Sequence, residues 1–180
     1  MTINKEAFAL LMQELENDTE TREFFREFPC FAEPLLEYAD LRGMSFTQVL
    51  ALCPSNSTLP GFISHIQTVR QRIHEEWLPK IPQTVRDDSA ARAHLIHTCL
   101  EMTMAPEELL REWQLHGERQ GFDAFLAKLE ERARECAQGS AIPLTDLISQ
   151  WRQYDMTLSD FLQKTEMRLG GWREWGYDTR

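Results

Sequence analysis

The chain has 180 residues, and its 29 acidic and 19 basic side chains give a formal net charge of −10. This charge argues against broad nonspecific binding of nucleic acid, because contacts with phosphate need Lys and Arg. It contains 22 Leu but only 3 Val, and no segment of useful length alternates apolar with polar residues, so an all-α fold is favoured over one with strands. A chain of this length can bury a substantial core, in one large domain or two small ones.

The first half of the chain predicts five helices, because apolar residues recur there at helical spacing. In the last of them, the stripe from Phe62 to Trp77 lies on one face, and Pro60 opens the helix. Gly43 is a natural C-terminal stop for an earlier helix. The predicted helices cover residues 4–16, 19–28, 32–42, 45–52 and 60–77.

Pro79 and Pro82 end the fifth helix, and the segment 78–88 is the best candidate for an internal boundary because prolines stiffen a link. We therefore expect helical bundles over residues 1–80 and 84–180. They form either two abutting subdomains or one compact domain.

The second half repeats the same kind of pattern, with a strong apolar stripe between Phe122 and Cys136 and a Gly after it. The fold that follows is an all-α multi-helix bundle built of helical hairpins. Helices are expected over residues 88–101, 104–117, 121–138, 144–154 and 158–169.

Three short stretches share one pattern, in which a hydroxyl residue stands where a helix should begin. They start at Met44, Met102 and Met156, 58 and 54 residues apart. The hydroxyl of an N-cap residue accepts a hydrogen bond from the first turn, so each stretch predicts a corner between helices. The spacing is compatible with a weak duplication of a hairpin of roughly fifty residues. The alternative is that capping selects the same few residues at any good corner.

These corners also have the outline of a DNA-binding helix-turn-helix. After Met102, however, the second helix carries Glu107, Glu108 and Glu112, which would repel phosphate. The corner at Met156 is a better candidate, because basic residues follow it. A purely structural corner is the competing interpretation.

His94 and His97 are three residues apart, with Glu101 four further on, so on a helix they share one face. Two imidazoles and a carboxylate could ligate a divalent metal, although a further ligand would have to come from elsewhere in the fold. No H-E-x-x-H or E-x-x-H motif is present, so we predict no metal and no cofactor. This face is instead a candidate ligand-binding or pH-sensitive surface.

The C-terminal end carries Trp172, Arg173, Trp175 and Tyr177 after a double glycine. Trp, Tyr and Arg are enriched at the hot spots of protein interfaces, so these four residues are candidate partner-binding residues on a tail. The alternative is that the tail folds back onto the protein's own core.

The four cysteines form no C-x-x-C pair, and their apolar neighbours favour reduced core thiols in a cytoplasmic protein. The N-terminus lacks the pattern of a signal peptide, and no apolar run approaches the ~20 residues that span a bilayer. We therefore expect no membrane association.

Catalytic motifs such as a nucleophile elbow, a P-loop or a dinucleotide fingerprint are missing. The leading hypothesis is a non-enzymatic, bacterial-type interaction module: an adaptor, a small regulator, or an inhibitor or immunity-like protein that covers a basic surface on a partner. The second hypothesis is a dimeric helix-turn-helix regulator, and the third is a metal- or cofactor-binding helical enzyme. The sequence does not determine the oligomeric state.

Overall fold

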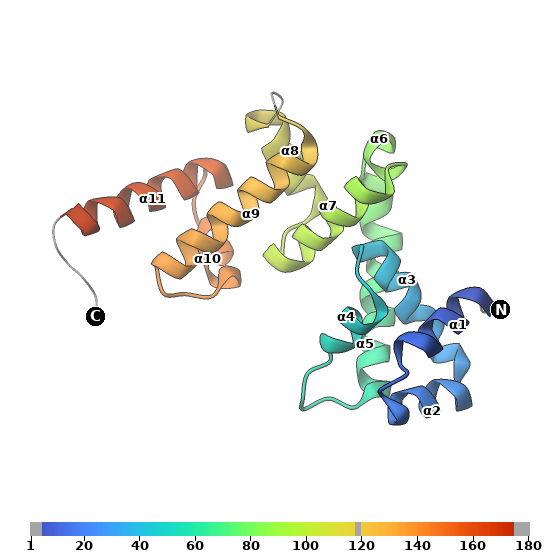
Figure 1. Ribbon diagram of the computed structural model, residues 1–180. Coiled ribbons are helices and arrows are strands. Elements are labelled where there is room, and N and C mark those ends of the chain that lie inside the picture. The colour runs from blue at the N-terminus through green and yellow to red at the C-terminus, as the bar shows by residue number, and fades with distance from the viewer. Residues whose placement is uncertain (1–4, 118–119, 175–180) are drawn as a thin grey trace. The chain divides into compact units, whose positions relative to one another are not determined.

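The computed structural model describes the backbone of residues 5–117 and 120–174 and the side chains as far as residue 170. Within these residues the fold is all-α, with eleven α-helices and no strand, so the predicted fold class is confirmed (Figure 1). The chain divides into two compact units, Met1–Ala93 and His94–Arg180, which we describe separately. No helix in the described segments has the length and apolar character needed to cross a membrane.

The N-terminal unit contains six α-helices, and short 3₁₀ and π turns link several of them. Their bounds are α1 Lys5–Glu14, α2 Thr19–Glu27, η1 Pro29–Phe31, α3 Ala32–Arg42, α4 Phe46–Ala51, α5 Leu59–Arg72, η2 Ile73–Trp77, η3 Leu78–Lys80 and α6 Gln83–Arg86.

Helices α3 and α5 pack against each other at the centre of this unit, and α4 packs on α3. Leu35 of α3 and Ile63 and Ile66 of α5 are almost fully buried. Phe25 of α2 is also buried and meets the ring of Phe46 of α4 edge to face, with ring centroids 5.5 Å apart. The apolar stripe predicted for the fifth helix thus forms part of this core.

The proline segment at residues 78–88 is helical in large part, since it forms η3 and α6, and its side chains Ile81 and Val85 are buried. The division between the two units falls further along the chain, between Ala93 and His94. That point lies inside α7 (Ser89–Met102), which therefore contributes residues to both units.

The C-terminal unit contains the second part of α7 and four further helices. Their bounds are α8 Pro106–His116, α9 Phe122–Gly139, α10 Leu144–Trp151 and α11 Leu158–Glu174. Helix α9 packs against α8, α10 and α11. The buried core includes Leu126, Leu129, Ala133, Leu147 and Leu162.

One corner geometry recurs three times, at Gly43, Thr103 and Ala141. Each of these residues has a left-handed backbone, with φ of 60°, 52° and 55°. The N–H of the next residue then donates to the carbonyl oxygen five residues earlier, at N–O distances of 2.9, 2.9 and 3.0 Å. This is the Schellman ending, which satisfies carbonyl groups at the end of a helix. In each case the next helix begins three residues after the left-handed residue.

The three predicted hydroxyl caps have different outcomes. At Ser45 the prediction is right: its hydroxyl accepts from the Gln48 N–H in a capping box. At Thr103 it is wrong, because this residue ends α7 in the left-handed conformation, and the Glu108 carboxylate accepts from the Ala105 N–H instead.

Thr157 does cap α11, since its hydroxyl accepts from the Asp160 N–H at 3.2 Å. It does not follow a left-handed corner of the kind found at Gly43. The recurring corners therefore lie at residues 43, 103 and 141, without regular spacing. This irregular spacing favours common capping chemistry over a duplicated hairpin as the reason for the likeness.

Candidate functional site

Two residues of the His94, His97 and Glu101 face of α7 pair with side chains of another helix. His94 Nδ1 lies 3.1 Å from Asp123 Oδ1, and Glu101 Oε2 lies 3.7 Å from Arg134 Nη2; both partners belong to α9. No group of three or more His, Cys, Asp or Glu side chains in the described segments could hold a metal ion. The role of this face in ligand binding or pH response stays a prediction.

The predicted aromatic tail lies mostly beyond the described side chains. Helix α11 does not end at residue 169, as the double glycine suggested, but continues to Glu174. The backbones of Trp172 and Arg173 are thus helical, whereas Trp175 and Tyr177 lie outside the described residues. The partner-binding role of these four residues stays a prediction.

The four cysteines are all free thiols, but only two lie in the core. Cys99 and Cys136 are buried, and burial raises the pKa of both thiols, that of Cys136 to about 11. Cys30 is exposed and Cys53 is half-buried, so the prediction of four core thiols is wrong for Cys30. Its position directly after Pro29, in a turn at the surface, explains the difference.

The best candidate for a binding site is a cluster of three phenyl rings on the N-terminal unit, which we call the aromatic surface: Phe24, Phe28 and Phe31. Their ring centroids are 5.5 to 6.0 Å apart, and Phe24 and Phe31 are stacked. Phe28 is 41% exposed, and the other two side chains are partly exposed. Three phenyl rings packed together at the surface form an exposed apolar patch. Such patches on a protein often mark interaction sites.

The local sequence explains why these rings remain at the surface. Asp18 caps the start of α2, and Pro29 then redirects the chain into the 3₁₀ turn η1, so Phe31 returns towards Phe24. A helix of nine residues presents only one side to the core, and Phe25 occupies that side. Phe24 and Phe28, one turn apart, lie beside Phe25 at the edge of that side, and they stay partly exposed.

Acidic side chains border the aromatic surface. Glu20 lies four residues before Phe24 and Glu27 lies three residues after it, so both stand beside this ring on α2. Both are exposed, and neither carboxylate has an ion-pair or side-chain hydrogen-bond partner among the described residues. By helical position, the two arginines of α2 lie on the opposite side of the helix. The aromatic surface therefore combines apolar rings with unpaired negative charge.

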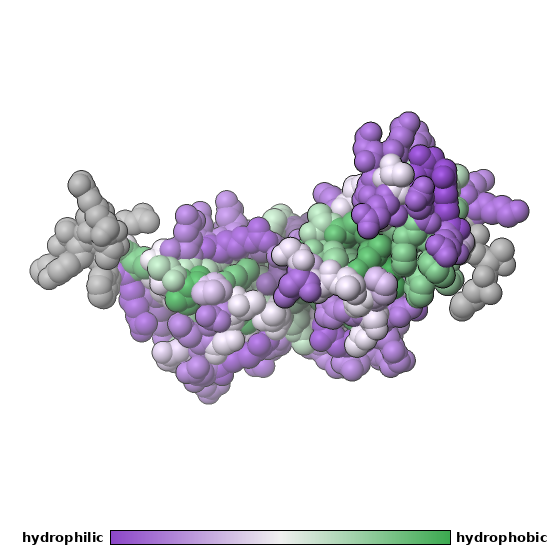
Figure 2. Space-filling view, turned by 90° about the horizontal axis from the view of Figure 1, so that it is seen from below, coloured by the Kyte–Doolittle hydropathy of each residue, from purple (hydrophilic) through white to green (hydrophobic). Residues whose placement is uncertain are grey.

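Figure 2 shows hydrophobic residues gathered between hydrophilic ones on the half of the view that holds the N-terminal unit. The sequence pattern places Phe24, Phe25 and Phe28 on one short helix but predicts no site there. The available signal was the density of phenylalanines, with Phe31 as the fourth within eight positions, on a helix too short to bury them all.

Comparison of the chain with protein-family models, with curated proteins and with solved structures finds no match. The function must therefore be inferred from the geometry and charge of the molecule itself.

Proposed function

We propose that this protein is a protein-protein interaction module that binds a partner through the aromatic surface. The observation that supports the proposal best is the combination of three partly exposed phenyl rings with unpaired carboxylates beside them. The partner would present an amphipathic segment, with apolar side chains for the rings and Lys or Arg for Glu20 and Glu27. Such a protein would act as an adaptor, a small regulator or an inhibitor.

Charge and apolar contact have separate roles in this proposal. The formal net charge of −10 would accelerate the approach of a basic partner, whereas the affinity would come from burial of the phenyl rings. Residues 1–42 carry ten acidic and four basic residues, so the segment that holds the aromatic surface is itself strongly acidic. Free thiols at all four cysteines support a reducing compartment such as the cytoplasm.

A labelled amphipathic helical peptide made of Leu and Lys tests this proposal, with a Leu and Glu peptide of the same pattern as the control. The protein should bind the Leu/Lys peptide and not its acidic counterpart. Replacement of Phe28 by Ala should weaken binding about tenfold or more, as expected for an interface hot spot. Leu115→Ala is the matched control, because this side chain of α8 is 56% exposed and lies in the other unit.

The role of the acids is tested with two pairs of variants that change the net charge equally. The double variant Glu20→Gln, Glu27→Gln should weaken binding of the Leu/Lys peptide. The control variant Glu131→Gln, Glu135→Gln alters exposed acids of α9 and should have little effect on this binding. Equal weakening by both pairs would mean that the overall charge, and not this surface, attracts the peptide. Capture from a lysate of the native host, followed by mass spectrometry, would then identify the natural partner.

The helix-turn-helix alternative is supported by the corner geometry and by Lys164 and Arg168 of α11, although the first turn of that helix carries Asp160. Helix α4 contains no charged residue, α10 contains one acid and no base, and the first turn of α8 carries two acids. Helices that enter the major groove need groups that pair with bases and phosphates. We therefore favour the protein-binding function. A salt-sensitive mobility shift with duplex DNA would support the alternative.

A further inference from the structure

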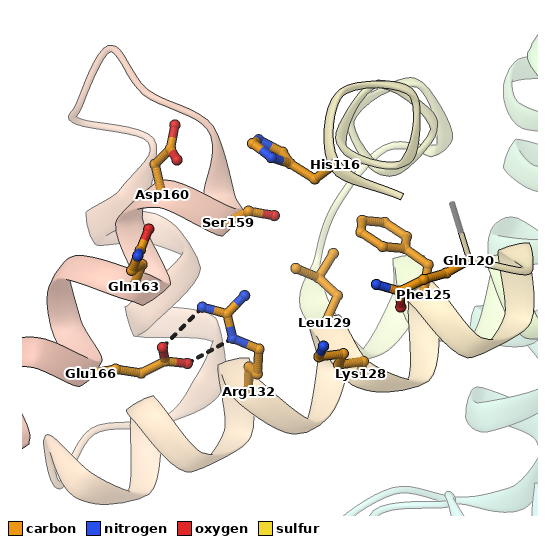
Figure 3. A pocket seen from close by; sticks show the side chains of 10 residues that line it. All are labelled: His116, Gln120, Phe125, Lys128, Leu129, Arg132, Ser159, Asp160, Gln163 and Glu166. Atoms are coloured by element: carbon orange, nitrogen blue, oxygen red, sulfur yellow. Dashed lines mark hydrogen bonds and ion pairs between the residues drawn. The ribbon is translucent and has the colours of Figure 1, made fainter. Parts of the chain in front are cut away.

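A pocket of about 430 Å³ lies in the C-terminal unit, between the end of α8, the middle of α9 and the start of α11 (Figure 3). Its volume is within the range of pockets that hold small molecules. Phe125 and Leu129 of α9, both largely buried, form an apolar base. Polar and charged side chains from all three helices form the walls.

Two of the pocket's charges are already balanced. The Arg132 guanidinium donates to both carboxylate oxygens of Glu166, at 2.7 and 2.9 Å, and this hydrogen bonding raises the pKa of Arg132. This bidentate pair joins α9 to α11 and fixes one end of the pocket. Neither side chain is therefore free to neutralise a ligand's charge.

The start of α11 is likewise satisfied from within the protein. The buried Glu112 carboxylate accepts hydrogen bonds from the N–H groups of Leu158 and Ser159, at 2.5 and 3.1 Å, and from the Ser159 hydroxyl. The Thr157 hydroxyl accepts a hydrogen bond from the Asp160 N–H, and its oxygen lies 3.0 Å from His116 Nε2. The helix terminus therefore holds an internal anion and offers no empty anion site.

Two opposite charges in the pocket lack a partner. Lys128 of α9 and Asp160 of α11 make no ion pair or side-chain hydrogen bond with the described part of the chain. They come from different helices, and Figure 3 shows Asp160 and Lys128 on different sides of the pocket. The Gln163 amide, one turn after Asp160, is also free to hydrogen-bond a ligand.

We propose that this pocket binds a small amphoteric molecule with an ammonium group, a carboxylate and an apolar body, which is the chemistry of a short apolar peptide. The ammonium group pairs with Asp160 and Gln163, and the carboxylate pairs with Lys128. The apolar side chains cover Phe125 and Leu129. This site is separate from the aromatic surface, so the inference goes beyond the proposed protein-binding function and does not depend on it.

Calorimetric titration of the full-length protein with the dipeptide leucyl-leucine tests this assignment. The free dipeptide should bind, and N-acetylation or C-terminal amidation should each weaken binding about tenfold, because each removes one charge partner. Asp160→Asn should weaken binding of the free dipeptide but not binding of its N-acetylated form. Lys128→Met should weaken binding of the free dipeptide but not binding of its C-terminal amide.

Asp146→Asn and Lys164→Met are the matched controls, since both alter exposed charges outside the pocket and should leave binding unchanged. All four changes are at exposed positions, and circular dichroism will verify that each variant folds. Absence of binding at millimolar leucyl-leucine would overturn the assignment. Equal binding by the blocked dipeptides, or equal weakening by the control variants, would overturn it as well.

Discussion

Gly43, at the corner between α3 and α4, has a backbone that other residues adopt only with strain. Its φ is 60°, and a Cβ atom placed on it would lie 3.2 Å from Cβ of Ala93. Replacement by Ala should lower the free energy of unfolding by about 1–2 kcal/mol, the cost of a left-handed backbone in a residue with a Cβ atom. Denaturant unfolding followed by circular dichroism measures this change.

Ala141 occupies the same left-handed position without being a glycine, with φ of 55°. Ala141→Gly should therefore leave stability nearly unchanged, because relief of the backbone strain offsets the extra entropy of the unfolded chain. Ala127→Gly, at an exposed position inside α9, should cost about 1 kcal/mol by helix propensity alone. An equal loss in the two variants would contradict the role assigned to Ala141.

The thiols differ in burial, and this difference predicts their reactivity. Cys30 is exposed and Cys53 half-buried, so both should react quickly with Ellman's reagent in the native protein. Cys99 and Cys136 should react only after unfolding, because they are buried and their raised pKa values keep them protonated at neutral pH. Rapid reaction of all four thiols in the native state would show that the C-terminal core is more open than described.

The contact of α8 with α9 depends on Gly117. A Cβ atom at this residue would lie 2.3 Å from Trp113 Cδ1 and 2.8 Å from Phe125 Cδ2, so neither ring could stay in place. Gly117→Ala should destabilise the protein by about 1–3 kcal/mol through overpacking. Gly121→Ala is the matched control: no atom lies within 4 Å of the added methyl group, so we expect a loss of less than about 1 kcal/mol, from the poorer helix cap.

The helices themselves were largely predictable, because Leu and Phe recur at helical spacing and Pro or Gly stands near most of their ends. The helical bounds at α3 and α9 agree with the sequence analysis to within about a residue. The role of Thr103 was not predictable, since a threonine is far commoner as an N-cap than in a left-handed helix ending. The continuation of α11 past Gly170 was not predictable either, since a double glycine is more typical of a helix end; Leu169, just before it, lies close to Gly139 of α9.

The candidate sites were less predictable than the helices, because they depend on how the helices pack together. Exposure of Phe28 depends on how much of α2 the core can cover, and the pocket brings together residues of α8, α9 and α11. The pocket leaves no local pattern in the sequence, and the local signal of the aromatic surface is the density of phenylalanines at residues 24–31. The histidines of α7 did form a local pattern, but His94 is paired with Asp123 across the helix packing.

At the scale of the whole molecule, the net charge of −10 predicts a strong dependence of partner binding on salt. Association of the Leu/Lys peptide should slow as salt rises from about 0.01 to 0.15 M, because the Debye length falls from about 30 to 8 Å. The dissociation rate should change much less, since phenyl burial holds the complex together. Stopped-flow fluorescence measures both rates, and a dissociation rate that rises as steeply as association falls would contradict this division of roles.

Fluorescence anisotropy with the labelled Leu/Lys peptide at about 0.15 M salt shows whether a partner binds at the aromatic surface, when the unchanged protein, Phe28→Ala and Leu115→Ala are compared side by side. Phe28→Ala should lose at least about tenfold in affinity, while Leu115→Ala should bind like the unchanged protein. Equal affinity of all three proteins would contradict the claim that the aromatic surface is where a partner binds.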